Sequence, residues 1–174
     1  MAEETEGLLD KVAERAGVDE YSADNPPLGS YSALAGMYGA GLSGALLLAH
    51  RSGRHLPERV EAFDLLLLGT ATYRLSRLIT KDKITSFLRA PFTEYVEPGA
   101  PGEVNERPRG TGVRRSVGEL LGCPFCLAQW VSTGFLCGLV FAPRPTRFVA
   151  SIFTVKAVSD FLQFAYTAAE SKAE

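Results

Sequence analysis

The 174-residue chain is poor in cysteine and histidine and has no excess of positive charge, and each shortage excludes a class of protein. Its three cysteines are too few for the disulfide scaffold of a small secreted domain. Its two histidines leave few candidates for a catalytic base or a zinc ligand. A formal net charge of −2 excludes a generally basic nucleic-acid binder, so we expect no nucleic acid among its partners.

The chain also lacks the sequence motifs of common enzyme classes. It contains no glycine-rich phosphate loop of the type G-x-x-x-x-G-K-[ST], no G-x-S-x-G nucleophile turn and no H-E-x-x-H zinc motif. The absence of these motifs favours a non-enzymatic protein, and apart from the cysteine motif described below we assign no catalytic or cofactor-binding residue.

The amino terminus lacks the basic and then apolar pattern of a secretory signal peptide. Residues 1–30 contain eight acidic residues against two basic ones, so we expect an acidic segment and linker that stays in the cytoplasm. Within it, residues 4–16 place their apolar side chains at helical spacing. This pattern predicts a short amphipathic N-terminal helix, with a solvated terminal helix as the alternative.

Charge is absent from two long stretches, residues 31–49 and 120–143. A helix of 19 residues rises about 28 Å, which is close to the thickness of the hydrocarbon core of a bilayer. Pro124 suits the first turn of a helix, so the second stretch predicts a helix over 124–142. We interpret both as transmembrane spans; for the first, the alternative is a buried core helix of a soluble protein.

Two further apolar stretches, 60–79 and 146–168, are long enough to span a bilayer but contain charged residues. We interpret them as two more spans, which gives four helices. The alternatives are an interfacial helix for 60–79 and a soluble amphipathic helix for 146–168. The expected fold is all-α: a small polytopic transmembrane helical bundle that occupies residues 31–169.

Glu61 and Arg147 lie near the start of these two stretches, and the charges further inside them are Asp64, Arg74, Arg77, Lys156 and Asp160. A single charge at the centre of a bilayer costs at least about 2.5 kcal/mol, so intramembrane charges usually pair with one another. We therefore expect polar pairing inside the bundle, with Arg74 or Arg77 near Asp160 or Asp64. A polar transport pathway is the alternative use of these residues.

Residues 81–115 connect the second and third expected helices and contain seven basic residues, four prolines and four glycines. This composition predicts a basic loop with little regular structure. With four spans, the loop and both termini lie on one side, which then holds ten Lys/Arg against five on the other. The positive-inside rule places that side, and both termini, in the cytoplasm.

Cys123 and Cys126 form a C-P-F-C motif at the start of the third expected helix. The positive end of the helix dipole favours thiolates, which suits disulfide exchange or metal ligation. For zinc, the pair supplies two of four ligands, so two chains would have to pool their cysteines. The remaining interpretation is structural, with cysteines that pack as small apolar residues and that the cytoplasm keeps reduced.

Two blocks of this sequence resemble a known family. The first is Tyr73-Arg74-Leu75-Ser76-Arg77-Leu78-Ile79-Thr80-Lys81-Asp82-Lys83-Ile84, and the second is Cys123-Pro124-Phe125-Cys126 followed by Trp130. In this order they are similar to the bacterial membrane proteins grouped as domain of unknown function 1360, over about residues 62–168. The resemblance implies an integral protein of the bacterial cytoplasmic membrane and carries over no activity.

The leading hypothesis is a membrane anchor or assembly partner that presents residues 1–30 and 81–115 to cytoplasmic partners. Besides the lipid bilayer, its expected partners are a second copy of the chain or another membrane or cytoplasmic protein. The alternative is a membrane thiol-redox or zinc-binding protein that uses Cys123 and Cys126. Zinc is then the one candidate cofactor.

Overall fold

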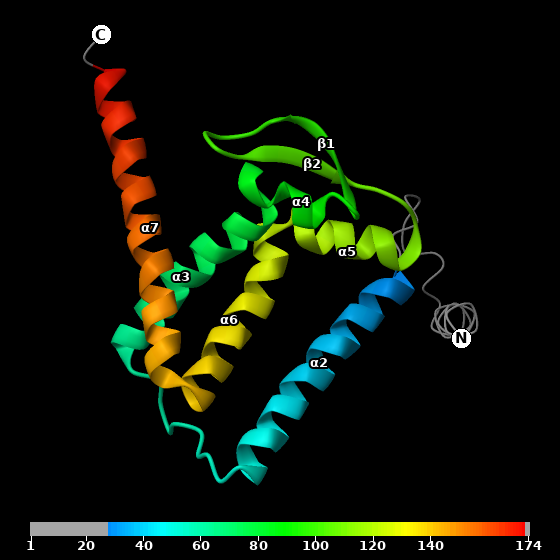
Figure 1. Cartoon of the computed structure of the whole chain (residues 1–174), viewed down its shortest axis with the longest axis vertical. Coiled ribbons are helices and arrows are strands. Elements are labelled where there is room, and N and C mark those ends of the chain that lie inside the picture. Colours follow the sequence, from blue (N-terminus) through cyan, green and yellow to red (C-terminus); the bar gives the residue numbers. More distant parts are fainter. Residues whose placement is uncertain (1–27, 173–174) are drawn as a thin grey trace.

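The computed structural model describes residues 28–172, which form a mostly helical protein with one small sheet (Figure 1). The expected helix over residues 4–16 and nearly all of the acidic segment lie outside the described residues. In chain order the elements are α2 (Leu28–Arg51), α3 (Ala62–Thr80), the 3₁₀ turn η2 (Lys83–Thr85), α4 (Ser86–Arg89), β1 (Thr93–Pro98), β2 (Val104–Pro108), α5 (Gly112–Gly122), α6 (Pro124–Phe141) and α7 (Pro143–Glu170).

Three of these helices, α2, α6 and α7, are long and apolar enough to cross a membrane. They cover the expected spans 31–49, 124–142 and 146–168. Helix α3 covers most of the fourth expected span, but its 19 residues include three charges, and it is not among these three helices.

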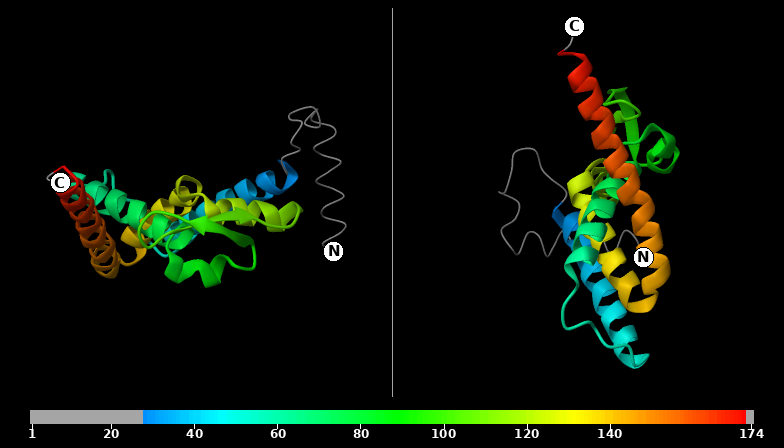
Figure 2. Two further views of the ribbon diagram at one scale, coloured as in Figure 1. Left: turned by 90° about the horizontal axis from the view of Figure 1, so that it is seen from above. Right: turned by 90° about the vertical axis from the view of Figure 1, so that its left-hand side faces the viewer.

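Helix α3 is the centre of the packing. It lies against both α6 and α7, while α2 packs against α6 and α5 (Figures 1 and 2). The core consists of Leu67, Leu68 and Ala71 on α3 with Phe135 and Ala150 on the neighbouring helices. Since Ala71 and Ala150 are fully buried and small, the backbones of α3 and α7 can approach closely.

Uncharged side chains hold α2 against α6. The Tyr38 hydroxyl lies 2.8 Å from the hydroxyl of Thr133 and accepts a 2.7 Å hydrogen bond from the amide of Gln129. The Tyr38 ring also meets the ring of Trp130 edge to face, with 5.3 Å between centroids. At the far end of the same two helices, the Arg54 guanidinium donates a 3.1 Å hydrogen bond to the Val140 carbonyl.

Residues 81–115 were expected to have little regular structure but contain short helices and two strands, so the fold is mostly helical with a small sheet rather than all-α. Strands β1 and β2 pair antiparallel and form a hairpin between α4 and α5. Pro98 and Pro108 each end a strand, and Gly102 adopts a φ of 83° in the turn. The prolines and glycines thus stand at the ends of short elements, where a missing N–H and a positive φ are tolerated.

We call residues 83–122 the cap, because η2, α4, the hairpin and α5 fold together at one end of the long helices (Figure 1). Gly118 of α5 lies directly against the hairpin, since a Cβ atom there would come within 2.4 Å of the Phe92 carbonyl oxygen. The start of α2, whose Tyr31 hydroxyl bonds Glu119 of α5, and the end of α7 lie towards the same end of the molecule.

Candidate functional site

We call Lys81 and Asp82, which join α3 to the cap, the cap entrance. Charged residues of α3, α7 and the cap entrance meet at one place, with Arg74 at its centre. The Arg74 guanidinium donates hydrogen bonds of 3.2 and 2.6 Å to the two carboxylate oxygens of Asp82. Its Nε atom lies 2.9 Å from Oδ2 of Asp160, close enough for an ion pair but not aligned as a hydrogen bond. Asp160 in turn pairs with Lys156 one helical turn earlier. One buried guanidinium therefore joins α3 to both the cap entrance and α7.

Arg77 makes a second connection between α3 and the hairpin. It donates hydrogen bonds of 2.9 and 2.6 Å to the two carboxylate oxygens of Glu103, the residue before β2. Backbone bonds support the same junction: the Val104 amide donates to the Lys81 carbonyl and the Lys83 amide to the Gly102 carbonyl, both at 2.9 Å. These contacts fix the hairpin at the end of α3.

A pocket of about 650 Å³ opens between α3, α7 and the hairpin turn. This volume is within the range of sites that hold small ligands. Tyr73 and Phe164 give it an aromatic wall. Its charged lining contains three cations and three carboxylates, namely Arg74, Arg77, Lys156, Asp82, Glu103 and Asp160.

Four of the five charged residues expected to pair within the bundle lie at this pocket, and Asp64 does not. Asp64 sits at the start of α3 and accepts hydrogen bonds of 2.8 and 2.7 Å from Arg147, near the start of α7. Because α3 and α7 run in the same direction, their first turns meet at one end and Arg74 and Asp160 meet towards the other. Arg147 lies at the start of the expected span 146–168 and was not among the residues expected to pair, so this partner of Asp64 was not predicted.

The most enclosed ion pair, Arg89 with Glu106, was also missed. Arg89 is fully buried; it donates 2.8 and 3.0 Å hydrogen bonds to Glu106 and also bonds the carbonyls of Ile79 and Asp82. Burial by itself raises the pKa of Glu106, but hydrogen bonds from Arg89 and Thr93 outweigh it and lower the pKa. The pair could have been found only with the hairpin register, because 17 residues separate its members.

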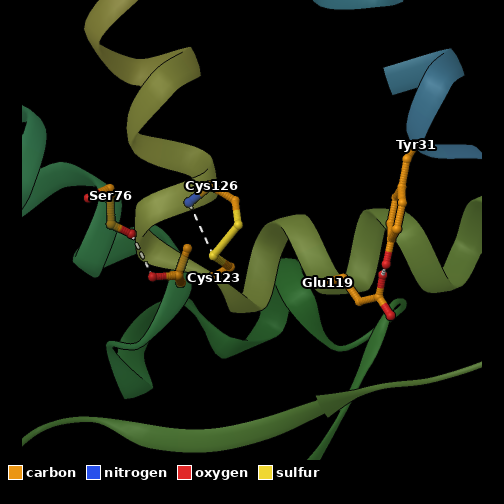
Figure 3. The surroundings of a disulfide bond; sticks show 6 residues. Tyr31, Ser76, Glu119, Cys123 and Cys126 are labelled. Atoms are coloured by element: carbon orange, nitrogen blue, oxygen red, sulfur yellow. Dashed lines mark hydrogen bonds between the residues drawn. A yellow bond between two sulfur atoms is a disulfide. The ribbon is translucent and has the colours of Figure 1, made fainter. Parts of the chain in front are cut away.

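The two cysteines of the C-P-F-C motif form a disulfide at the corner between α5 and α6 (Figure 3). The expectation of reduced thiols therefore differs from the structure, in which the two Cα atoms lie 5.3 Å apart, within the range for a disulfide. Cys123 also caps α6, since its sulfur accepts a hydrogen bond from the Cys126 amide. Cys126 and Phe125 are exposed, whereas Cys137 is a free thiol within α6.

A disulfide cannot supply the thiolates that zinc requires. Among residues 28–172, no group of three His, Cys, Asp or Glu side chains is arranged to hold a metal ion. The zinc hypothesis thus requires reduction of the disulfide and ligands from a second chain.

The family described as "Protein of unknown function (DUF1360)" matches residues 67–166. Sporulation protein YjcA of Bacillus subtilis (strain 168) is 39% identical over 80 residues, which are 44% of this chain and 67% of the relative. UPF0713 protein YngL of the same organism is 30% identical over 105 residues, 58% of this chain and 78% of the relative. No solved structure matches.

Proposed function

The chain belongs to the DUF1360 family of proteins of unknown function, and from that premise we propose that it is a non-enzymatic anchor and assembly partner in the bacterial cytoplasmic membrane. Helices α2, α6 and α7 have the length and composition of membrane spans. Helix α3 completes a set of four crossings, in which the cap and both termini face the cytoplasm, as the Lys/Arg distribution favours.

The observation that carries the assembly role is the exposed apolar surface of the cap. Ile84 and Phe87 are 77% and 70% exposed although they lie outside the apolar spans. Tyr95 on β1 is 61% exposed and lines the same surface pocket as Phe87, so the two residues share one face of the cap. Since apolar patches on folded protein commonly mark interaction sites, we assign this face to a protein partner, either a second copy of the chain or another membrane or cytoplasmic protein.

In this proposal, the ion pairs of the cap and the cap entrance stabilise the position of the cap. Arg74, Arg77 and Arg89 each engage a carboxylate and thereby hold the cap in a fixed position at the end of α3. A contact surface of this kind needs a rigid support rather than a reactive group.

Photocrosslinking in cells tests the assembly role. A photoreactive residue at Phe87 should give a covalent adduct with a protein, and the same residue at Arg144, exposed at the opposite end of α7, should not. An adduct at Phe87 that contains only lipid contradicts the assembly role. Separately, release of the full chain from membranes by an alkaline wash contradicts membrane insertion itself.

One observation favours a second candidate, a thiol–disulfide exchange protein. The Cys123–Cys126 disulfide stands at a helix start, and Cys126 and its neighbour Phe125 are accessible to a partner thiol. Replacing both cysteines with serine separates the two candidates, with Cys137→Ser as the matched control. Unchanged assembly in the double variant supports the anchor, and loss of assembly in that variant alone supports the exchange protein.

A further inference from the structure

The α3–α7 pair has two layers of charge that stand closer together than the faces of a bilayer. One layer is Asp64 with Arg147, and the other contains Arg74 and Asp160. Along α3 the layers are about 15 Å apart and along α7 about 20 Å, by the helical rise per residue. The hydrocarbon core of a bilayer is about 30 Å thick. If the Asp64–Arg147 layer lies at one face of the hydrocarbon core, the Arg74–Asp160 layer therefore lies inside the core, about 10–15 Å short of the opposite face.

Charged side chains at that depth are stable only when they pair with other charged or polar groups. The protein supplies part of it, because each cation of the pocket faces a carboxylate. Arg74 is less exposed than its partners, but the other two cations of the pocket are more exposed than theirs. The side chains of Lys156 and Arg77 are 49% and 32% exposed, against 24% for Asp160 and 15% for Glu103.

Arg77 and Lys156 also have hydrogen-bond donors that no described acceptor engages, which supports an anionic ligand. Arg77 uses Nε and Nη2 on Glu103, and its Nη1 has no partner among residues 28–172. Lys156 has three N–H donors and engages only Asp160 within the same part of the chain. Both residues line one pocket, so a ligand there meets several free donors from two helices. An anion with several acceptor oxygens fits this arrangement.

We propose that this pocket binds the phosphate of a phospholipid headgroup. The bound headgroup lies deeper in the bilayer than the headgroups of the surrounding lipids. Lys156 and Arg77 donate to the phosphate oxygens. The acyl chains follow the outer surface of α7, where Phe161 and Leu162 are exposed beside the pocket residue Phe164. A bilayer that thins locally at α3 and α7 brings the headgroup to this depth. The inference rests on the membrane insertion in the proposed function and is independent of the assembly partner.

Native mass spectrometry and thermal unfolding of the full chain in neutral detergent test this site. We expect dioleoylphosphatidylglycerol to be retained and to raise the melting temperature, because it carries the phosphate and the chains together. Dioleoylglycerol has the same chains without phosphate, and inorganic phosphate has no chains, so neither should have this effect. Equal stabilisation by dioleoylglycerol, or saturation of the effect by inorganic phosphate, overturns the proposal.

Variants locate the binding. Lys156→Gln removes a charged donor and should weaken phosphatidylglycerol binding at least about tenfold. Arg144→Gln removes an exposed cation at the other end of the same helix and should bind as the parent does. Ala100→Trp leaves every charge in place and should block the pocket by size alone. Unaltered binding in both Lys156→Gln and Ala100→Trp overturns the assignment, whereas alkaline extraction of the chain would overturn the membrane premise instead.

Discussion

The half of the molecule around α2 and α6 is held mainly by contacts between neutral groups and contains no ion pair between those two helices among residues 28–172, whereas ion pairs hold the half around α3, α7 and the hairpin. Tyr38 meets Thr133, Gln129 and Trp130 in the first half. Ion pairs connect α3 to α7 and to the hairpin in the second. The neutral half has an uncharged length of about 28 Å, which matches a bilayer, and the charged half does not. In the proposed membrane location, the two halves therefore differ in the thickness of apolar lipid that they match.

The largest expected effect comes from the buried pair of the charged half. Arg89→Met leaves the Glu106 carboxylate buried without its cation and should lower the free energy of unfolding by about 3–5 kcal/mol. The double variant Arg89→Met/Glu106→Met should recover most of that loss. Denaturant unfolding in detergent measures both. Arg107→Ala removes one partner of an exposed pair on the same hairpin and should cost less than about 1 kcal/mol. Equal losses for Arg89→Met and Arg107→Ala would show that burial does not matter here.

A direct test of the two halves compares Arg74→Leu with Tyr38→Phe. Arg74→Leu leaves Asp82 without its partner and should cost about 3 kcal/mol. Tyr38→Phe removes one neutral hydrogen-bonding group between helices and should cost about 0.6 kcal/mol. The same unfolding measurement serves for both. A larger loss for Tyr38→Phe would reverse the comparison.

Glycine substitutions compare the packing within the two halves. Gly118→Ala drives a methyl group into the Phe92 carbonyl and should cost about 1–3 kcal/mol. Gly134→Ala on α6 meets nothing within 4 Å, so it should be neutral or slightly stabilising because alanine favours a helix. Thermal unfolding distinguishes the two. A stable Gly118→Ala variant would mean that α5 can move away from the hairpin.

Acid should weaken the charged half before the neutral half. The pKa of Glu106 is lower in the folded protein than in the unfolded chain. Its contribution to stability is therefore present above the ordinary glutamate pKa and is lost as the pH falls through the lower folded value. Each unit of difference corresponds to about 1.4 kcal/mol. Hydrogen exchange at β2 should report the loss, while emission of Trp130, the single tryptophan, should change only at lower pH. Simultaneous changes would mean that both halves unfold together.

Charge-free length and helical spacing were enough to predict the long helices, and the paired sequence blocks were enough to predict the family, which is confirmed. The hairpin was missed because its prolines and glycines were interpreted as breaking regular structure over much of residues 81–115. In the folded chain, Pro98, Gly102 and Pro108 stand at strand ends and in the turn. Breakers mark where elements end, but they do not show whether short elements lie between them.

The pairing of charges was harder to predict than their presence. Lys156 and Asp160 lie one turn apart on one helix, so their proximity follows from the sequence. The partners of Asp64 and Arg89 depend on which helices run side by side and on the strand register. These are tertiary features, and no local spacing in a single sequence reports them.

The disulfide at the corner of α5 and α6 joins residues only three positions apart. A covalent ring this small restricts the unfolded chain far less than a bridge between distant segments does. The bend between the two helices already follows from the extended backbone of Cys123, which ends one helix and begins the next. Reduction would therefore leave an exposed sulfhydryl group on Cys126 and a partly buried one on Cys123 while the corner keeps its shape, so the oxidation state can change without rearrangement of the long helices.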